Sequence, residues 1–427
     1  MLFSLLHFCR FENLNNKCLP SLCLHFKVHQ PYQLKRYLKQ DVQVCSCYED
    51  SAADKANINK VADECYLPAN EVVYKAIETT KGKFKIAYSI SGVILGLLER
   101  YRPDVIENFK FLVDTGCVEM LGETYYHSLS SLHSKKEFER QVKMHTRLIY
   151  DLFCQTPSVF RNTELIHNND LAAIVTSLGF KGILCEGIER LLTGKSVNKI
   201  YTTPRESIKL LLRNVTLSDD IAFRFGEEHW DKYPLTAEKF AEWIHLHNSN
   251  TQVINLFMDY ETFGIHKKKE TGIFDFLEAL PVQILSNADW KFSLPSEIIY
   301  EHQTSDVYDV QKTISWEDRS KECCVWCENM MQNNTLKKIY SIENMVLQNK
   351  NEVLMETWGR LQTVDYLYYM ADNNCIHNKG RYPNPHETAQ TAFDYYNNIV
   401  TDLEISLIKK MLERSQLSYY SSIGNLY

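Results

Sequence analysis

The feature that most constrains the fold is a regular alternation of short β-like runs with helical stretches over the first two-thirds of the chain. Seven runs of apolar and β-branched residues are typical of strands, at 22–29, 84–91, 118–126, 158–166, 180–185, 208–212 and 253–260. Helical patterns separate them, as at 71–79, 105–113 and 136–153. Such alternation indicates a parallel α/β sheet. Because seven units occur without a dinucleotide-binding glycine fingerprint, a closed or nearly closed barrel is favoured over an open sheet.

The pattern changes near residue 315, after which strand signals become rare. Mostly helical segments follow, at 316–332, 335–370 and 387–415. We therefore expect three parts in the chain: a poorly ordered lead-in at 1–21, a barrel at 22–314, and a helical region at 315–427 that packs on the barrel.

Charge and cysteine content limit which binding partners and which cellular compartment are expected for the protein. The net charge is −7 and the basic residues are scattered, which argues against a general nucleic-acid binder. No stretch reaches the ~18 consecutive apolar residues of a membrane span. The 13 cysteines form no repeating framework, and the first residues lack a basic region and a signal cleavage site. We therefore predict a cytoplasmic protein that binds neither nucleic acid nor membrane.

The cysteines also give no clear metal site. Cys324 and Cys327 have the spacing of a zinc-ligand pair. A second pair is missing, because Cys45 and Cys47 stand too close together in sequence to supply one. We therefore expect no bound metal and no cofactor.

Polar clusters stand at the carboxyl ends of several predicted strands, where α/β barrels build their active sites. In chain order, the polar residues at these ends are His29, Glu119, Glu123, Glu164, Asp259 and Glu261. Most single carboxylates at strand ends are caps or surface groups. Clusters at four matching strand ends are harder to explain in that way, since a barrel brings all four to one mouth.

Glycosidic bond cleavage needs two carboxyl groups that face one pocket, one protonated and one ionised. Asp259 and Glu261 are two residues apart on a predicted strand, so we expect both side chains on the same face. Their mutual repulsion would help to hold a proton on one of them. This pair can therefore supply an acid.

Five segments resemble the five characteristic regions of glycoside hydrolase family 57, in its α-amylase-like branch. In chain order they are VHQPYQLKRY at 28–37, GCVEMLGETYYHSL at 116–129, FRNTELIHNND at 160–170, MDYETFG at 258–264 and WGRLQTVDYLYYM at 358–370. The resemblance implies an α/β fold, a (β/α)7 or incomplete TIM-like barrel, followed by a C-terminal helical region. This fold agrees with the strand–helix pattern.

The resemblance also implies a role for each matching residue. Glu164 aligns with the catalytic nucleophile and Asp259 with the general acid/base of a retaining mechanism. The residues expected to contact the sugar are His29, Glu119, Glu261 and Asp365. The residues expected to orient the Glu164 carboxylate and keep it ionised are Asn162, Thr163 and Asn168.

Simpler explanations stay open for some of these residues. His29 could be a hydrogen-bonded turn histidine, Glu119 a barrel-interior charge paired with an arginine, and Asp365 an anchor for the helical region. The chain also departs from the family pattern at Ile265, where a glutamate is usual, and at Tyr366, where a histidine is usual. These departures concern the sugar subsites rather than the two catalytic carboxylates.

We therefore predict a retaining hydrolase that cleaves α-1,4-glucosidic bonds in starch- or glycogen-type glucans without a cofactor. A 4-α-glucanotransferase or branching enzyme of the same family is the first alternative, because only the acceptor differs. A non-catalytic glucan-binding relative is the second, given the altered fourth and fifth regions. A metal-dependent deacetylase-like barrel is disfavoured, because the strand ends lack an Asp with paired His ligands.

Overall fold

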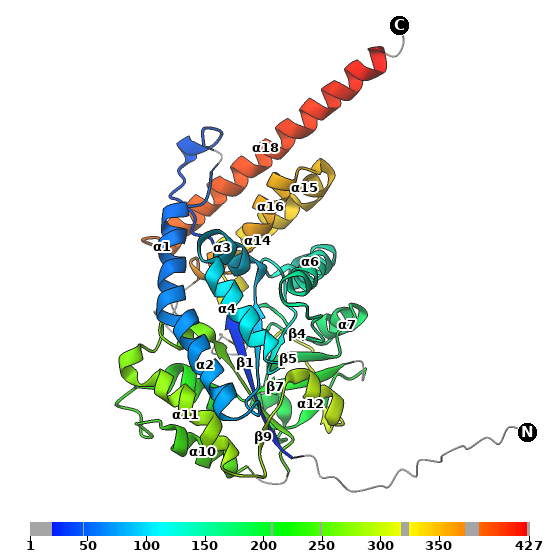
Figure 1. Cartoon of the computed structure of the whole chain (residues 1–427). Coiled ribbons are helices and arrows are strands. Elements are labelled where there is room, and N and C mark those ends of the chain that lie inside the picture. Colours follow the sequence, from blue (N-terminus) through cyan, green and yellow to red (C-terminus); the bar gives the residue numbers. More distant parts are fainter. Residues whose placement is uncertain are drawn as a thin grey trace, which may run out of the picture.

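Seven parallel strands form the centre of the molecule. The computed structural model describes residues 19–45, 47–205, 208–247, 250–316, 324–371 and 384–424 (Figure 1). The central strands are β1 (Ser21–Val28), β2 (Ile86–Ile90), β3 (Val118–Met120), β4 (Val159–Arg161), β5 (Gly182–Glu186), β7 (Lys209–Arg213) and β8 (Val253–Asp259). Each overlaps one of the seven predicted runs. Most of the predicted lead-in, residues 1–18, lies outside the described residues.

The seven strands close into a barrel. Parallel pairing joins β1 to β2, β2 to β3, β4 to β5, β5 to β7, β7 to β8 and β8 back to β1. A parallel bridge between Gly122 and Phe160 joins the chain after β3 to β4 and completes the ring. The predicted (β/α)7 fold class is therefore confirmed.

Three further strands were not predicted. They are β6 (Ile200–Thr202), β9 (Lys291–Phe292) and β10 (Asp306–Val307). β6 pairs antiparallel with β7, β10 pairs with β6, and β9 pairs with the start of β1. Each has only two or three residues, too few for a recognisable side-chain period.

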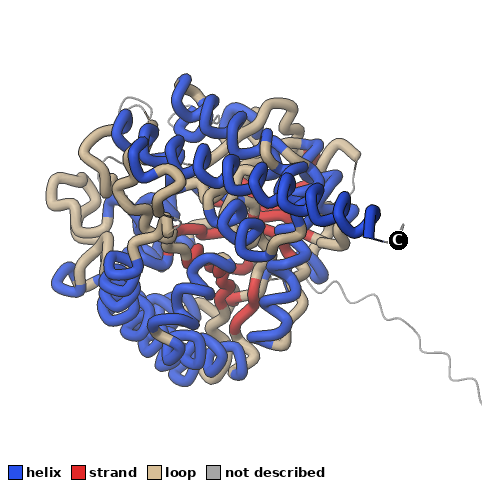
Figure 2. The backbone as a smooth tube through the Cα atoms, turned by 90° about the horizontal axis from the view of Figure 1, so that it is seen from above, coloured by secondary structure: helices blue, strands red, loops and turns tan. Residues whose placement is uncertain are grey.

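Helices surround the barrel, so that in a view from above the strands occupy the middle (Figure 2). The longer ones are α1 (Ser51–Val61), α2 (Leu67–Thr79), α3 (Gly92–Tyr101), α4 (Pro103–Asp114), α6 (Lys135–Phe153), α7 (Asn169–Ser177), α10 (Ala237–His245) and α11 (Ile273–Leu285). Short ones are α5 (Ser130–His133), α8 (Glu189–Leu192), α9 (Val215–Asp219) and α12 (Pro295–Glu301). Among the described residues, no helix combines the length and the apolar character needed to cross a membrane.

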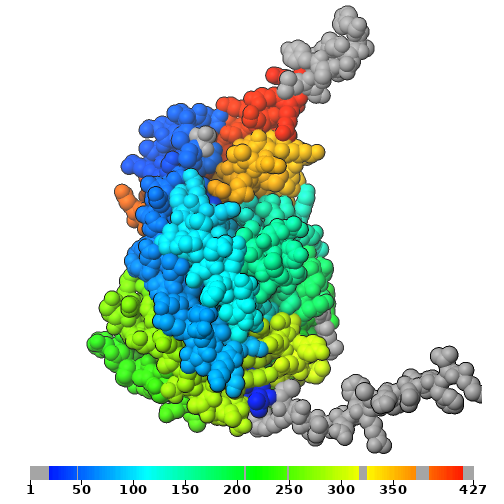
Figure 3. All heavy atoms as spheres, in the orientation of Figure 1, coloured from blue at the N-terminus to red at the C-terminus, as the bar shows by residue number. Residues whose placement is uncertain are grey.

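A helical region follows the barrel. Its helices are α13 (Cys324–Cys327), α14 (Met330–Ser341), α15 (Glu343–Asn349), α16 (Glu352–Arg360), α17 (Asp365–Tyr368) and α18 (Ala389–Gly424). Apolar side chains of α14 to α18 share a core with Tyr37 and Tyr48 from the loop after β1, and α18 extends away from the barrel (Figures 1 and 3). We propose a boundary near residue 315, because β10 is the last strand of the described chain and α13 begins at Cys324.

Alternation along β1 decides which side chains enter the barrel. Leu24, Phe26 and Val28 pack outward against the helices. The barrel interior instead contains at least one apolar side chain from each of the seven strands or the residue just after it, including Cys23, Ala87, Leu121, Val159, Leu184, Leu211 and Phe257. Because side chains two residues apart share a face, Lys27 points inward like Cys23, at the carboxyl end of the barrel.

Candidate active site

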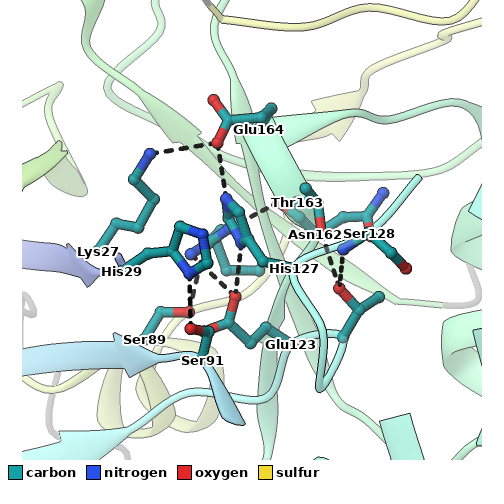
Figure 4. A network of polar contacts seen from close by, with 12 residues as sticks. Lys27, His29, Ser89, Ser91, Glu123, His127, Ser128, Asn162, Thr163 and Glu164 are labelled. Atoms are coloured by element: carbon teal, nitrogen blue, oxygen red, sulfur yellow. Dashed lines mark hydrogen bonds and ion pairs between the residues drawn. The ribbon is translucent and has the colours of Figure 1, made fainter. Parts of the chain in front are cut away.

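The carboxyl ends of the strands hold a buried cluster of charged side chains (Figure 4). Lys27 on β1 stands directly across from Asp259, the last residue of β8. Glu164 follows β4 on the other side of the mouth. The exposed fractions are 4% for Lys27, 1% for Asp259 and 3% for Glu164. Charges so deeply buried are stable only when they are paired and hydrogen-bonded.

Glu164 occupies a strained turn. It lies in the 3-10 helix η3 (Thr163–Leu165) with φ 53° and ψ 31°, and Leu165 also has a positive φ of 50°. Left-handed conformations of residues other than glycine cost of order 1–3 kcal/mol and persist only where the surroundings enforce them. This geometry lets the chain leave β4 and still turn the Glu164 carboxylate toward Lys27.

Three donors surround the Glu164 carboxylate. Lys27 Nζ donates to Oε1 at 3.2 Å, His127 Nε2 lies 2.8 Å from the same oxygen, and Trp316 Nε1 donates to Oε2 at 2.6 Å. Burial alone would raise the pKa of this carboxyl, but Lys27, His127 and Trp316 together hold the pKa well below its usual value. Glu164 is therefore ionised at neutral pH.

The side chains predicted to orient Glu164 make hydrogen bonds to other groups instead. Asn162 donates to Ser131 and to the Ile166 carbonyl. The Thr163 hydroxyl pairs with that of Thr124, and Asn168 caps α7 by accepting from the Leu171 amide. The expectation that these three side chains orient Glu164 is therefore wrong, since more distant parts of the chain supply the donors.

His127 connects Glu164 to a second buried carboxylate. Its Nδ1 lies 3.3 Å from Glu123 Oε2, and the same oxygen pairs with Arg161 at 3.1 Å. Burial alone would lower the pKa of His127, but its hydrogen bonds to Glu123 and Glu164 raise the pKa. Arg161 and His127 overcome burial at Glu123 and lower its pKa to about 2. The ring therefore favours the charged form and can donate from both nitrogens.

Lys27 also fixes how far apart the two proposed catalytic carboxylates lie. Its ammonium nitrogen is 3.2 Å from Glu164 Oε1 and 3.0 Å from Asp259 Oδ1. These two oxygens are therefore at most 6.2 Å apart. Separations of ~5–5.5 Å are typical of retaining glycosidases, and ~6.5–9.5 Å of inverting ones.

Glu261 lies beside Asp259 in the 3-10 helix η5 (Tyr260–Thr262). Its Oε1 accepts from the Tyr66 hydroxyl at 2.5 Å, from the His29 amide at 3.3 Å and from Gln30 Nε2 at 3.4 Å. Burial and the nearby negative charge of Asp259 raise the pKa of Glu261 to about 7. The predicted repulsion within this pair thus acts on Glu261, which retains its proton into the neutral range.

His29 and Asp365 join the C-terminal helical region to the barrel mouth. His29 Nε2 lies 2.9 Å from Asp365 Oδ2, and Nδ1 lies 2.7 Å from the Ser91 hydroxyl. The His29 ring packs against that of His127 with centroids 4.0 Å apart. Burial and the charge on His127 lower the pKa of His29 to about 4, so the proton of this stacked pair belongs to His127.

A pocket of about 330 Å³ adjoins this cluster, a volume at the lower end of those typical of ligand sites. His29 and Asp365 line it, together with Gln30, Asn57, Ile265 and His266. A larger hollow of about 640 Å³ lies next to α12 and touches none of the carboxylates above. Of these two, the smaller pocket is the better candidate for a sugar, because His29 and Asp365 of the buried cluster line it.

Glu119 lies away from this cluster. It pairs in register with Ala87 on β2, and through it with His25, one inward layer below Lys27. Its carboxylate accepts from the Ser296 amide at the start of α12 at 2.9 Å. Burial raises its pKa to about 7. The structure therefore differs from the expectation that Glu119 contacts the sugar, and places Glu123 at the mouth instead.

This placement predicts that Glu119→Gln keeps near-normal activity and stabilises the fold at alkaline pH. In the folded state the Glu119 pKa is raised from 4.5 to about 7. The folded protein therefore keeps this proton to a higher pH than the unfolded chain does, and the free energy of unfolding falls as the pH rises from 4.5 to about 7. The amide avoids that loss and can still accept from Ser296. Urea unfolding should show a gain on the order of 3 kcal/mol at about pH 8 and none at about pH 4. A large loss of activity would contradict this placement and support the original expectation that Glu119 contacts the sugar.

The structure thus brings together five of the six predicted site residues, namely His29, Glu164, Asp259, Glu261 and Asp365. Sequence reasoning missed Lys27, His127 and Trp316. Lys27 could have been found, because it stands two residues before His29 and shares its strand face. Among the described residues, no group of three His, Cys, Asp or Glu side chains is arranged to hold a metal ion.

Comparison with known proteins places this geometry in context. Residues 23–311 match the model of Glycosyl hydrolase family 57. A protein of Methanocaldococcus jannaschii that carries a provisional α-amylase name is 38% identical over 411 residues, covering 92% of this chain and 86% of that protein.

Two solved structures share the fold. An α-amylase from Thermotoga maritima has a TM-score of 0.63 at 12% identity, covering 94% of this chain and 96% of that one. A 4-α-glucanotransferase from Thermococcus litoralis has a TM-score of 0.65 at 14% identity, covering 82% of this chain. This chain spans only 56% of the length of that transferase. At such low identities the likeness shows the fold alone.

Proposed function

The chain belongs to glycosyl hydrolase family 57, and on this premise we propose that it is a retaining α-glucan hydrolase of the α-amylase type. One observation carries the proposal. Lys27 contacts both Glu164 and Asp259, and so holds one oxygen of each buried carboxylate at most 6.2 Å from the other at the mouth of the barrel. That separation supports a double displacement, because it leaves little room for a water between carboxylate and sugar.

In the first step, Asp259 protonates the glycosidic oxygen while Glu164 attacks the anomeric carbon. The bond from this carbon to the leaving oxygen breaks, and a bond to a Glu164 oxygen forms. The acid role of Asp259 rests on the family match and on its position close to Glu164, while the neighbouring Glu261 holds its own proton into the neutral range. The low pKa of Glu164 supports its role as the nucleophile.

In the second step, the Asp259 carboxylate takes a proton from water, and the water oxygen attacks the same carbon and displaces Glu164. The product then keeps the α configuration of the substrate, because each of the two displacements inverts it. Transfer to a sugar hydroxyl would use the same residues, so a 4-α-glucanotransferase or branching activity is the alternative.

The substrate class follows from the family and from the pocket beside the carboxylates. We propose that Gln30, Asn57 and His266 bind sugar hydroxyls, since their polar groups line this pocket. Ile265 lines the same pocket, so the missing glutamate removes a polar contact there. Tyr366 instead donates to the Tyr32 carbonyl at 2.8 Å and is buried in the helical core. The Tyr366 departure therefore lies outside the proposed sugar site. The cytoplasmic location of the protein stays a prediction.

Product analysis tests the proposal. We expect the protein to convert maltoheptaose and soluble starch only into shorter glucans, seen by thin-layer chromatography. A ladder that extends above maltoheptaose would indicate transfer rather than hydrolysis. If neither substrate changes although both bind, the chain is a non-catalytic glucan-binding relative and the proposed function is wrong.

A further inference from the structure

We propose that Lys27 is a positioning residue that sets both the separation and the charge of the two catalytic carboxylates. This inference rests on the proposed function, because it concerns the carboxylates to which that function assigns the chemistry. The family resemblance assigned no role to Lys27, and the role follows here from its contacts.

The position of Lys27 allows it to join three strands. It lies on β1, opposite Ser89 of β2 on one side and Asp259 of β8 on the other. Its side chain extends inward and brings the ammonium within 3.2 Å of Glu164, which follows β4. Figure 4 shows Lys27 and His127 approaching the Glu164 carboxylate from different directions. One flexible stem therefore ties the ends of β1, β4 and β8 together.

The surroundings shield most of the Lys27 side chain from bulk water. The residue is 4% exposed, and its nitrogen lies 5.5 Å from the centre of the Trp316 ring. A buried ammonium is costly unless anions compensate it. Two carboxylates at 3.0 and 3.2 Å provide that compensation. The reverse also holds, because without Lys27 the carboxylates of Glu164 and Asp259 would repel each other across a short gap of low dielectric.

Other charges act on the same carboxylates and must be counted. Groups that face the Lys27 cluster from the neighbouring elements are His29 from the chain just after β1, His127 from the chain after β3, Glu261 from η5, His266 from the chain after η5 and Asp365 from α17. Their charges largely oppose one another: His127 favours the ionised form of Glu164, whereas Glu261 opposes a further negative charge beside Asp259. Lys27 differs from all of them in contacting both catalytic carboxylates.

Substitution of Lys27 should therefore change the pH profile as well as the rate. Without the ammonium, ionisation of Glu164 and of Asp259 becomes harder. Both limbs of the kcat/KM profile should then move to higher pH by about one unit or more in Lys27→Met and Lys27→Gln. In Lys27→Arg both limbs should stay in place, because the charge is kept. The rate of Lys27→Met at its own optimum should fall by about 100-fold or more.

A matched control separates this effect from a general loss of a lysine. Lys85→Met removes an ion pair with Glu297 outside the cluster and should leave both the rate and the profile unchanged. If Lys27→Met does not fold, as judged by thermal unfolding, the comparison of Lys27→Gln with Lys27→Arg carries the same test. Limbs that stay in place in Lys27→Gln while the rate falls would mean a merely structural lysine and overturn the proposal.

A second readout does not need turnover. With carboxyl-¹³C glutamate incorporated, the Glu164 resonance is identified by its absence in Glu164→Gln, and its titration is followed by NMR. We expect its midpoint to rise in Lys27→Gln relative to the wild type. If the wild type cleaves no glucan, the proposed function fails but this titration still tests Lys27. An unchanged midpoint would overturn the role of Lys27 even in an active enzyme.

Discussion

Asp259→Asn is expected to slow cleavage of natural glucans by about 10³-fold while sparing the first step on substrates that need no proton. Starch and maltooligosaccharides have poor leaving groups, and their glycosidic oxygen must be protonated as the bond breaks. An aryl maltoside with an acidic phenol leaves without that help. The variant should therefore show a fast burst of phenol from the aryl substrate, followed by slow turnover.

The burst has a definite cause. Asp259 also activates the water of the second step, so its loss lets the glycosyl-enzyme accumulate. Asparagine further removes one anion from Lys27, which then pairs more strongly with Glu164 and favours its ionised form. Stopped-flow release of phenol measures the burst, and Asp289→Asn, at an exposed position, is the control. If both substrate types lose the first step equally, Asp259 is not the acid.

The barrel was predictable because its strands are defined by local periodicity. Seven short apolar runs separated by helices require a parallel sheet, and β8 with its sequence VINLFMD is buried along its whole length. The short β6, β9 and β10 lacked that signal. They are recognised as strands only because they pair with β1, β7 or each other in the folded protein.

The face of the sheet to which a side chain points was predictable from the sequence. How far along the barrel axis that side chain lies was less predictable. The run at 118–126 places Glu119 and Glu123 on one face, but β3 ends at Met120. A strand advances ~3.3 Å per residue, so four residues separate the two carboxylates by more than 10 Å along an extended chain. Glu123 consequently reaches the mouth, whereas Glu119 contacts α12.

The surroundings of Glu164 depended on tertiary structure. Trp316 lies beyond the last strand, and no local pattern links it to the segment around Glu164. Its indole nevertheless donates to the Glu164 carboxylate. Asp365 raised a similar question, because its sequence indicated only a helix. The structure pairs it with His29 at the barrel mouth, a contact that also joins the helical region to the barrel.

Glu164→Ala is expected to lower kcat on all α-glucans by on the order of 10⁴-fold or more, because it removes the group that forms the covalent bond. Glu164→Gly opens the same space and suits the local backbone better, since glycine adopts a φ of 53° without strain. Both variants should remain folded by circular dichroism. Glu119→Gln, which removes a buried carboxylate outside the cluster, should keep near-normal activity and serves as the matched control.

The anomeric configuration of the product made with azide tests the central claim most directly. In Glu164→Ala or Glu164→Gly, azide can occupy the vacated space and attack the anomeric carbon of an activated α-glycoside from the side where Glu164 stood. The account predicts that azide restores turnover and that proton NMR shows a β-glycosyl azide, formed by a single inversion. An α-glycosyl azide, or near-normal activity of these variants without azide, would contradict the assignment of Glu164 as the nucleophile.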